Sequence, residues 1–266
     1  MEFGGISIHP VMDGYGRGVA REIYSKPEAD GDPWACHTDL LDADGGFTMP
    51  MGGFLVRTGE RTILVDAGLG RVDTGDYNGG AFMESLRLLG VTSADVTDVV
   101  FSHLHFDHVG WATQRGEIVF PNATYRCHAA DWAYFVDGPE ALPAVVRKLS
   151  PLVERLSLFD QECTIAPGVD ALPVPGHTPG STIYVLSGGG VRALLLGDVV
   201  HSVVELLEGG WQAAFDVDRQ AAAAVRERIA RELEASGDLA AGPHISDMRF
   251  GRLLATGDGR RTWTTV

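Results

Sequence analysis

The sequence predicts one domain of the α/β class. Short apolar runs, which are typical of buried strands, alternate along the chain with longer stretches that are typical of helices. Side chains that can bind metal directly follow several of the predicted strands. The 266 residues contain no repeat, low-complexity tract or linker, and this length is ordinary for one α/β domain with a large core. We therefore expect residues 1–266 to form a single domain.

The first half of the chain contains a predicted hairpin, a strand and several helices. Residues 53–57 and 62–65 are apolar runs on either side of Gly59-Glu60, which favours two antiparallel strands. A helix over 82–89 is expected to end at Gly90, because glycine commonly closes a helix C-terminus. The other elements predicted in this half are a strand over 99–101 and helices over 129–136 and 144–158, the latter broken near Pro151.

The second half contains the strongest predicted helix. Residues 218–235 are rich in Ala, Arg and Glu, and Asp218 is a favourable N-cap. Residues 182–186 and 193–196 are predicted to pair as strands across the turn 187–190. The remaining predicted strands cover residues 171–174, 239–241, 250–255 and 262–264.

The segment 102–108 is the strongest functional signal. It reads S-H-L-H-F-D-H and places four metal-capable side chains within six residues, directly after an apolar strand. In an extended stretch, His103 and His105 point the same way and can bind one metal ion. A turn after this pair would direct Asp107 and His108 toward a second ion. A lone histidine is more often an ordinary core or surface residue, but this spacing of ligand types indicates a metal site.

Further polar motifs follow predicted strands elsewhere in the chain. They contain Asp66 in V-D-A-G, His177 in G-H-T-P-G, Asp198 in L-G-D and His244 in G-P-H. Ligands at strand ends are held by a rigid sheet, while the loops are free to shape a pocket around them.

In this order the motifs resemble the metallo-β-lactamase superfamily, from about Gly52 to the C-terminus. The resemblance implies a four-layer αββα sandwich with metals at one edge of its two sheets. Imidazole and carboxylate ligands without thiolate suit two Zn²⁺ ions, and Mn²⁺, Fe²⁺ or Co²⁺ are alternatives. The metal ligands implied by the superfamily pattern are His103, His105 and His177 for the first ion, Asp107, His108 and His244 for the second, and Asp198 as the bridge between them.

The resemblance also implies an enzyme that hydrolyses an ester-type bond in a lactone, a carboxylic ester or a phosphotriester. Two neighbouring cations lower the pKa of a bridging water toward about 7, so the expected nucleophile is a metal-bridging hydroxide. Asp107 is expected to protonate the leaving group in addition to binding metal. Asp66 precedes the ligand motifs, and we expect its carboxylate to orient an imidazole, with a turn or N-capping role as the alternative.

The branch within the superfamily depends on His201. The segment 102–108 resembles acyl-homoserine lactonases, which commonly carry Tyr three residues after the bridging Asp, where this chain has His201. The segments 197–201, 215–218 and 241–244 look more like the methyl-parathion-hydrolase type, whose members hydrolyse phosphotriesters and often esters or lactones. We therefore expect His201 to act in the catalytic pocket, with a structural or surface role as the alternative.

Other activities and other classes of function are also compatible with this fold. A β-lactam or thioester hydrolase is the nearest alternative, although no basic C-terminal helical patch for a glutathione thioester is evident. A flavodiiron-type oxidoreductase would replace ligand histidines with carboxylates and would need a flavin domain. A non-catalytic metal-binding protein usually lacks ligands, whereas this chain carries the complete set.

Residues 9–50 differ from the rest, because they are rich in Gly, Pro and Asp with large apolar side chains scattered among them. One interpretation is a poorly ordered surface segment. We favour an N-terminal arm over about residues 1–50, lying across the active-site mouth or on a second subunit, because large apolar residues are rarely exposed in such numbers. The side chains concerned are Tyr15, Tyr24, Trp34, Phe47 and Met49.

Composition limits the partners. The formal net charge of −15 repels a phosphate backbone, and no Lys and Arg cluster offsets it, so we expect a small-molecule substrate and no nucleic acid. No run approaches the roughly 18 apolar residues of a membrane span. Cys36, Cys127 and Cys163 are far apart, and residues 1–5 do not resemble a secretory leader, so we expect a cytoplasmic protein. An arm on a second subunit would fit a homodimer.

Overall fold

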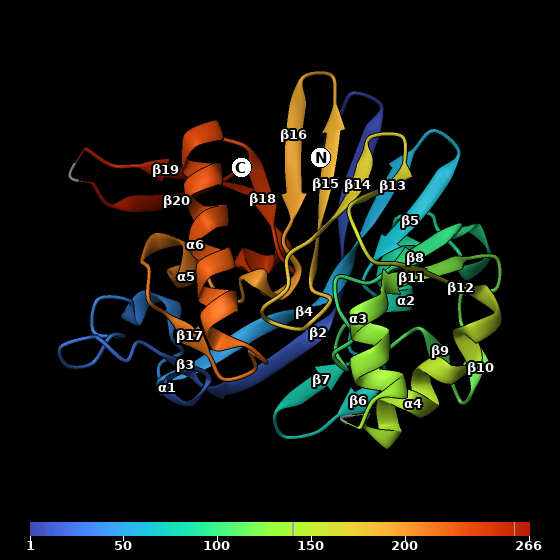
Figure 1. Cartoon of the computed structure of the whole chain (residues 1–266), viewed down its shortest axis with the longest axis horizontal. Coiled ribbons are helices and arrows are strands. Elements are labelled where there is room, and N and C mark those ends of the chain that lie inside the picture. The colour runs from blue at the N-terminus through green and yellow to red at the C-terminus, as the bar shows by residue number, and fades with distance from the viewer. Residues whose placement is uncertain (140, 258) are drawn as a thin grey trace.

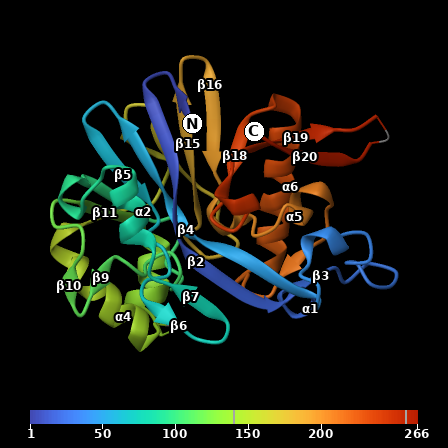
Figure 2. The same cartoon turned by 180° about the vertical axis from the view of Figure 1, so that it is seen from behind.

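The computed structural model describes residues 1–139, 141–257 and 259–266. Two large β-sheets pack face to face with an apolar cluster between them, and helices cover their outer faces (Figure 1). The helices α2, α3 and α4 lie beside the first sheet, and α5 and α6 lie beside the second, as the view from behind also shows (Figure 2). The layers therefore run helix, sheet, sheet, helix, and the predicted αββα sandwich is confirmed.

The sheets contain strands from all parts of the chain. The first sheet contains, in spatial order, β12 (Leu156–Phe159), β11 (Thr124–His128), β8 (Asp98–Val100), β5 (Arg61–Val65), β4 (Gly46–Thr58), β2 (Ile6–Val19), β7 (Tyr77–Gly79) and β6 (Val72–Asp73), with β1 (Glu2–Phe3) paired to β2. The second contains β13 (Cys163–Ala166), β14 (Val169–Pro173), β15 (Thr182–Gly188), β16 (Val191–Leu195), β18 (Leu239–Ala241), β19 (Gly251–Ala255) and β20 (Arg261–Thr265). Two small additional sheets pair β9 (Thr113–Gln114) with β10 (Glu117–Ile118), and β3 (Tyr24–Ser25) with β17 (Gln212–Ala213).

The helices are shorter, apart from the last. The α-helices are α1 (Ala20–Ile23), α2 (Phe82–Leu88), α3 (Ala129–Trp132), α4 (Pro143–Leu149), α5 (Val204–Leu207) and α6 (Arg219–Ser236). A π-helical segment, Ala133–Asp137, continues α3, and a 3₁₀ segment, Ser150–Arg155, continues α4.

Successive residues of one strand face different layers of the core. On β5, Leu64 packs in the cluster that includes α2, whereas Ile63 packs in the cluster between the two sheets. On β15, Tyr184 belongs to the cluster between the sheets, and Ile183 belongs to the one that includes α6. Because both faces of these strands are covered, each contains a continuous apolar run, residues 63–65 in β5 and 183–186 in β15, instead of alternating apolar and polar residues.

Part of the N-terminal segment belongs to the first sheet, because residues 2–3, 6–19 and 46–50 lie in β1, β2 and β4. The long strands β2 and β4 pair antiparallel, with a register shift between Met12 and Gly14. No strand was predicted within residues 9–50, because glycine and proline are frequent there. Glycine is required at residue 14, since a Cβ there would lie 1.8 Å from the carbonyl oxygen of Asn78 on β7. These strand residues of the expected arm are thus built into the sandwich, whereas residues 20–45 lie outside the two large sheets.

The large side chains of this segment are mostly buried. Tyr24, Trp34 and Phe47 belong to one buried cluster with Trp211, in which the Trp34 and Trp211 rings lie 5.0 Å apart. The alternative of a poorly ordered surface segment is therefore wrong for these residues, although Tyr15 is exposed.

Most of the other predicted elements are confirmed, with one correction. The predicted helix over 144–158 ends early, and residues 156–159 form β12 instead, parallel to β11. Pro151 lacks the N–H that a continuing α-helix needs, and pairing at the sheet edge then determines the conformation of the following residues. Within the described residues, no helix is both long and apolar enough to cross a membrane.

The start of α6 is attached to the loop that carries His177. The Asp218 side chain accepts a hydrogen bond from the Ala221 N–H at 2.9 Å, which confirms the predicted N-cap. The backbone N–H groups of Val217 and Asp218 donate to the carbonyl oxygens of His177 and Gly176.

We predict that Asp218→Ala lowers the free energy of unfolding by about 1 kcal/mol, because the first turn of α6 loses its cap. The measurement is chemical denaturation followed by circular dichroism. Arg228→Ala, an exposed change in the middle of α6, is the control and should change stability by less than about 0.5 kcal/mol. Equal effects of the two substitutions would contradict a capping role.

Candidate metal centre

The predicted ligands meet at one edge of the two sheets. The segment that carries His103, His105, Asp107 and His108 follows β8 in the first sheet. The other three follow strands of the second sheet: His177 lies after β14, Asp198 after β16 and His244 after β18. Since β16 and β18 are parallel, and β14 is antiparallel to their neighbour β15, these three strands end at the same edge.

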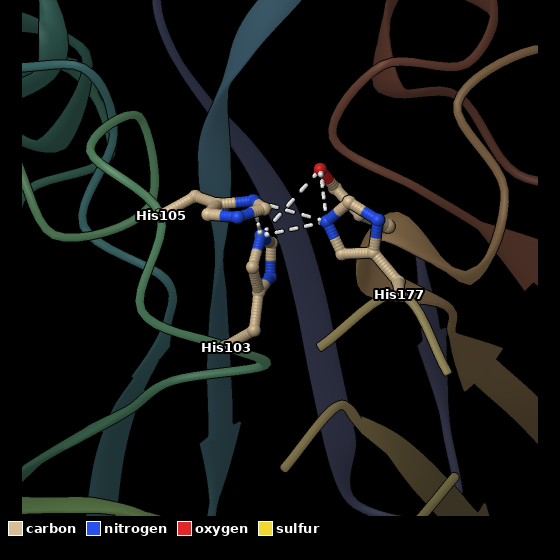
Figure 3. A group of neighbouring side chains, drawn as sticks. His103, His105 and His177 are labelled. Carbon is tan, nitrogen blue, oxygen red and sulfur yellow. Dashed lines mark hydrogen bonds and ion pairs between the residues drawn. The ribbon is translucent and has the colours of Figure 1, made fainter. Parts of the chain in front are cut away.

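The first group is formed by three imidazoles that converge on one point (Figure 3). The Nδ1 atom of His105 lies 2.9 Å from Nε2 of His103 and 3.0 Å from Nε2 of His177. The two Nε2 atoms lie 3.3 Å apart. The carboxylate oxygen Oδ2 of Asp198 completes the group at 3.6 Å from Nε2 of both His103 and His177.

The second group shares Asp198 with the first. Its other oxygen, Oδ1, lies 3.2 Å from Nε2 of His108 and 3.2 Å from Nε2 of His244. The Oδ2 atom of Asp107 lies 3.6 Å from the His108 nitrogen and 3.4 Å from the His244 nitrogen. Each oxygen of one carboxylate therefore faces a different group, which is the arrangement expected of a ligand that bridges two ions.

The donor atoms fit metal ions. Nitrogens bound tetrahedrally at about 2.0–2.1 Å from one zinc ion lie roughly 3.3 Å apart, close to the spacing within the first group. In the second group, the buried atoms Nε2 of His108 and Oδ1 of Asp198 have no hydrogen-bond partner among the described residues. Buried polar atoms without a partner are rare, and here both point at the position that a cation would occupy.

The electrostatics of the first group favour neutral imidazoles. Burial, together with the neighbouring His177, lowers the pKa of His105 to about 3. Burial likewise lowers the pKa of His103 and of His177. The rings are thus unprotonated at neutral pH, which is the form that binds a metal ion.

The second group carries an excess of negative charge. Burial alone would lower the pKa of His108, but Asp198, Asp107 and Asp66 outweigh it and raise this pKa well above the ordinary value. The same competition, with Asp198 as the strongest opposing charge, raises the pKa of His244 to about 9. These carboxylates stabilise positive charge among them, whether it is carried by protons or by a divalent cation.

Each imidazole of the second group is fixed through its other nitrogen. Nδ1 of His108 lies 3.0 Å from Oδ2 of Asp66, which also accepts the Ser102 hydroxyl proton. The prediction that Asp66 orients an imidazole is thereby confirmed. Nδ1 of His244 lies 2.8 Å from the carbonyl oxygen of Pro50 on β4. Such contacts set the tautomer and orientation of a metal-binding imidazole.

Asp216 orients His177 of the first group in the same way, a role that was not predicted from the sequence. Its Oδ1 lies 3.1 Å from Nδ1 of His177. The two residues are distant in sequence, and the only local signal was the resemblance of segment 215–218 to a known branch.

An apolar cavity of about 170 Å³ opens beside both groups. Met49 and Met51 of β4 form one wall, while Tyr77, Phe106 and Phe215 lie closer to the surface. The ring of Phe106 meets that of Tyr77 edge to face at 5.2 Å. The remaining lining residues are His105, Asp107, Asp198, His201 and His244.

His201 lines this cavity and is almost fully buried. Its Nε2 lies 3.4 Å from Oδ2 of Asp198, and its ring lies parallel to that of His244, with 6.0 Å between centroids. His201 therefore lies at the edge of the metal centre, and its catalytic role stays a prediction. Other histidines lie elsewhere: His37 contacts Glu208, and His128 accepts a hydrogen bond at the start of α3.

Residues 53–246 match the sequence profile of the metallo-beta-lactamase superfamily. The chain belongs to this superfamily. An N-acyl homoserine lactonase from Bacillus sp. is 30% identical over 159 residues, which cover 53% of this chain and 58% of the relative. The N-acyl homoserine lactonase AiiB from Agrobacterium fabrum is 26% identical over 159 residues, covering 50% of this chain and 56% of the relative. The chain thus matches little more than half the length of these relatives.

Two solved structures share the superfamily fold over the whole chain. AidC, a dizinc quorum-quenching lactonase in complex with a product, has a TM-score of 0.88 at 24% identity and covers 100% of this chain and 96% of its own. The hydrolase AbOPH has a TM-score of 0.84 at 23% identity with the same coverage. At sequence identities of 23–24%, the similarity to these two structures shows a shared fold alone.

Asp131 on α3 joins the two loops that carry the first group. Its buried carboxylate accepts hydrogen bonds from the Leu104 N–H at 3.1 Å, the Thr178 hydroxyl at 3.0 Å and the Gly180 N–H at 2.6 Å. Burial raises the pKa of Asp131 to about 6, although these hydrogen bonds work in the opposite direction.

This raised pKa predicts a pH-dependent contribution to stability. Between the unfolded value of about 4 and the folded value, the folded state holds a proton that the unfolded state has lost, so this contribution falls as the pH rises. Asn does not titrate. The free energy of unfolding of wild type minus that of Asp131→Asn should therefore decrease by roughly 1–3 kcal/mol from about pH 4 to about pH 6.5.

Denaturation in the presence of a chelator measures this difference without a contribution from bound metal. The exposed substitution Asp30→Asn is the control and should show no such trend. A difference that widens as the pH rises would contradict the raised pKa.

Proposed function

We propose that this chain is a metal-dependent hydrolase that opens lactones and related ester bonds. The single observation that carries the proposal is the pair of ligand groups sharing Asp198 at the floor of an apolar cavity. The N-acyl homoserine lactonases among its relatives support a lactone as one substrate class.

The residues that would hold two cations are those of the two groups described above, with Asp198 between them. Zn²⁺ suits a set of imidazole and carboxylate donors, and Mn²⁺, Fe²⁺ or Co²⁺ would suit it as well. When bound, two such cations would lower the pKa of water to about 7 and polarise an ester carbonyl.

The cavity favours an uncharged substrate with an apolar part. Met49, Met51 and Phe215 offer apolar surface beside the ligand groups, and the described lining residues include no Lys or Arg. The carboxylates of a β-lactam or of a glutathione thioester would find no Lys or Arg among these lining residues to pair with, which supports a lactone or a simple ester over these alternatives. The net charge of −15 likewise supports a small molecule over a nucleic acid as the partner.

Asp107 and His201 are the proposed catalytic side chains beside the substrate. Asp107 lines the cavity, where its carboxylate can take up the proton that the attacking water releases and pass it to the leaving oxygen. His201, in the place where lactonases commonly carry Tyr, can donate a hydrogen bond to the substrate oxygen, with a shorter reach and with sensitivity to pH. We therefore propose a broad profile that includes esters and phosphotriesters. A cytoplasmic location and a homodimer stay predictions.

We predict that the protein binds two transition-metal ions per chain. Asp198→Ala should weaken both sites, because each oxygen of this carboxylate faces one group, whereas His177→Ala should mainly empty the first. Elemental analysis after loading measures the ratio. Removing the metal with a chelator should abolish hydrolysis, and Zn²⁺, Mn²⁺ or Co²⁺ should restore it. One ion or fewer per fully loaded wild-type chain would disprove the two-metal assignment.

We predict that His201→Phe retains both metals but changes the ratio of lactone to phosphotriester rates, because the ring lines the cavity without belonging to either group. The test compares kcat/KM on a lactone, an aryl ester and a phosphotriester, together with metal content. Loss of metal would identify His201 as a support of the metal centre, and unchanged ratios would exclude it from the substrate pocket.

A further inference from the structure

A buried arginine lies beneath the metal centre. Arg226 on α6 is only 2% exposed, although its helical neighbours Ala222, Ile229 and Leu233 form an apolar face. Arginine is almost never fully buried unless it is paired. A neutral apolar residue could occupy this position on the helix. The presence of a buried cation there therefore calls for an explanation.

Each nitrogen of the guanidinium group has a hydrogen-bond acceptor. Its Nε donates to the Val199 carbonyl oxygen at 2.8 Å, and Nη1 donates to the Trp211 carbonyl oxygen at 3.1 Å. Nη2 donates to Oδ2 of Asp216 at 3.1 Å, and Nε lies 3.2 Å from Oε1 of Glu205. One planar group thus connects four separate positions, which the compact ammonium group of lysine could not do.

Each of the two carboxylates that face Arg226, those of Asp216 and Glu205, also contacts a histidine of the site. Asp216 binds Arg226 and, through Oδ1, lies 3.1 Å from Nδ1 of His177. The other carboxylate, Glu205, accepts the backbone N–H of His201 at 2.7 Å and lies 3.6 Å from Nδ1 of the same residue. Val199, whose carbonyl oxygen Arg226 binds, directly follows Asp198.

This arrangement is a costly way to stabilise a fold. Three charges are withdrawn from water, and two buried carboxylates face one cation. Well-packed apolar residues in place of a buried ion network are often equally or more stabilising. The contacts instead converge on the segments that carry His177, Asp198 and His201, which points to placement of these side chains.

We propose that Arg226 is a positioning residue of the metal centre, acting through Asp216 on His177 and through Glu205 and Val199 on the segment 198–202. The inference rests on the proposed function, because it requires that the two groups bind metal. By holding Asp216 in place, Arg226 keeps the proton of His177 on Nδ1 and the Nε2 lone pair directed at the first group.

The first metal site should depend on Arg226 more than the second. His108 and His244 are oriented by Asp66 and by the Pro50 carbonyl oxygen, neither of which has a hydrogen bond or ion pair to Arg226 among the described residues. His177 has its orienting contact from Asp216, which Arg226 holds.

The test compares Arg226→Gln and Asp216→Asn with wild type in Zn²⁺ competition against a chelator, and in the anomalous scattering of crystals at limiting zinc, which assigns occupancy to each site. Both variants should bind zinc at the first site about 10–100-fold more weakly, while the second site stays within about threefold of wild type. If Arg226→Gln does not fold, Asp216→Asn alone decides, because it leaves the cation paired with Glu205.

Two further variants separate positioning from other effects. Arg261 on β20 pairs with Glu227 and Glu234 of α6. Arg261→Gln removes this cation and should change stability but not zinc affinity. The double variant Arg226→Gln with Glu205→Gln restores the net charge of the buried network without the guanidinium group. It should recover stability relative to Arg226→Gln but not first-site affinity.

Two outcomes would overturn the inference while leaving the proposed function intact. One is wild-type zinc affinity at the first site in Arg226→Gln and Asp216→Asn. The other is full recovery of this affinity in the double variant, which would reduce the role of Arg226 to charge balance. A wild-type protein that does not bind two ions would instead overturn the proposed function itself.

Discussion

The site depends on one buried carboxylate that lies between two groups of imidazoles. Asp198 is 6% exposed, and its two oxygens face different groups at 3.2–3.6 Å. A charge withdrawn from water in this way requires compensation nearby, by protons or by metal ions. The nitrogens that surround it are themselves held neutral in the first group and are surrounded by carboxylates in the second. The pair of metal positions follows from this division of one carboxylate between two sets of donors.

Contacts from the surrounding fold orient three of the imidazoles, those of His108, His177 and His244. Asp66 follows β5 of the first sheet, Pro50 lies in β4, and Asp216 lies between β17 and α6, so the contacts that orient the imidazoles come from three separate parts of the chain. Asp131 adds a fourth contact, which ties the loop after β8 to the loop after β14. Rigid supports of this kind keep ligand geometry within the narrow limits that binding and catalysis require.

The cavity combines a charged floor with apolar walls. The ligand groups lie at its base, while Met49, Met51 and Phe215 offer surface that gains from contact with an apolar substrate. The two methionines reach the site only because β4 continues well beyond its pairing with β5 and carries residues 46–53 toward the metal centre. The N-terminal segment therefore contributes to the pocket through the first sheet, and its aromatic residues pack behind the wall.

The sequence by itself determined the superfamily, the seven predicted ligands and most elements after residue 50, because these depend on short-range spacing and on local apolar patterns. The H-x-H-x-D-H motif and the N-cap at Asp218 are signals of this kind. Only the tertiary structure decided the rest. Glycine-rich residues 9–19 form β2 because they pair with β4 and β7, residues 156–159 become a strand because β11 offers an edge, and Asp216 and Arg226 meet His177 through folding of distant segments. Contacts between residues far apart in the chain leave no local pattern, since each partner has a residue type that is equally common on a protein surface.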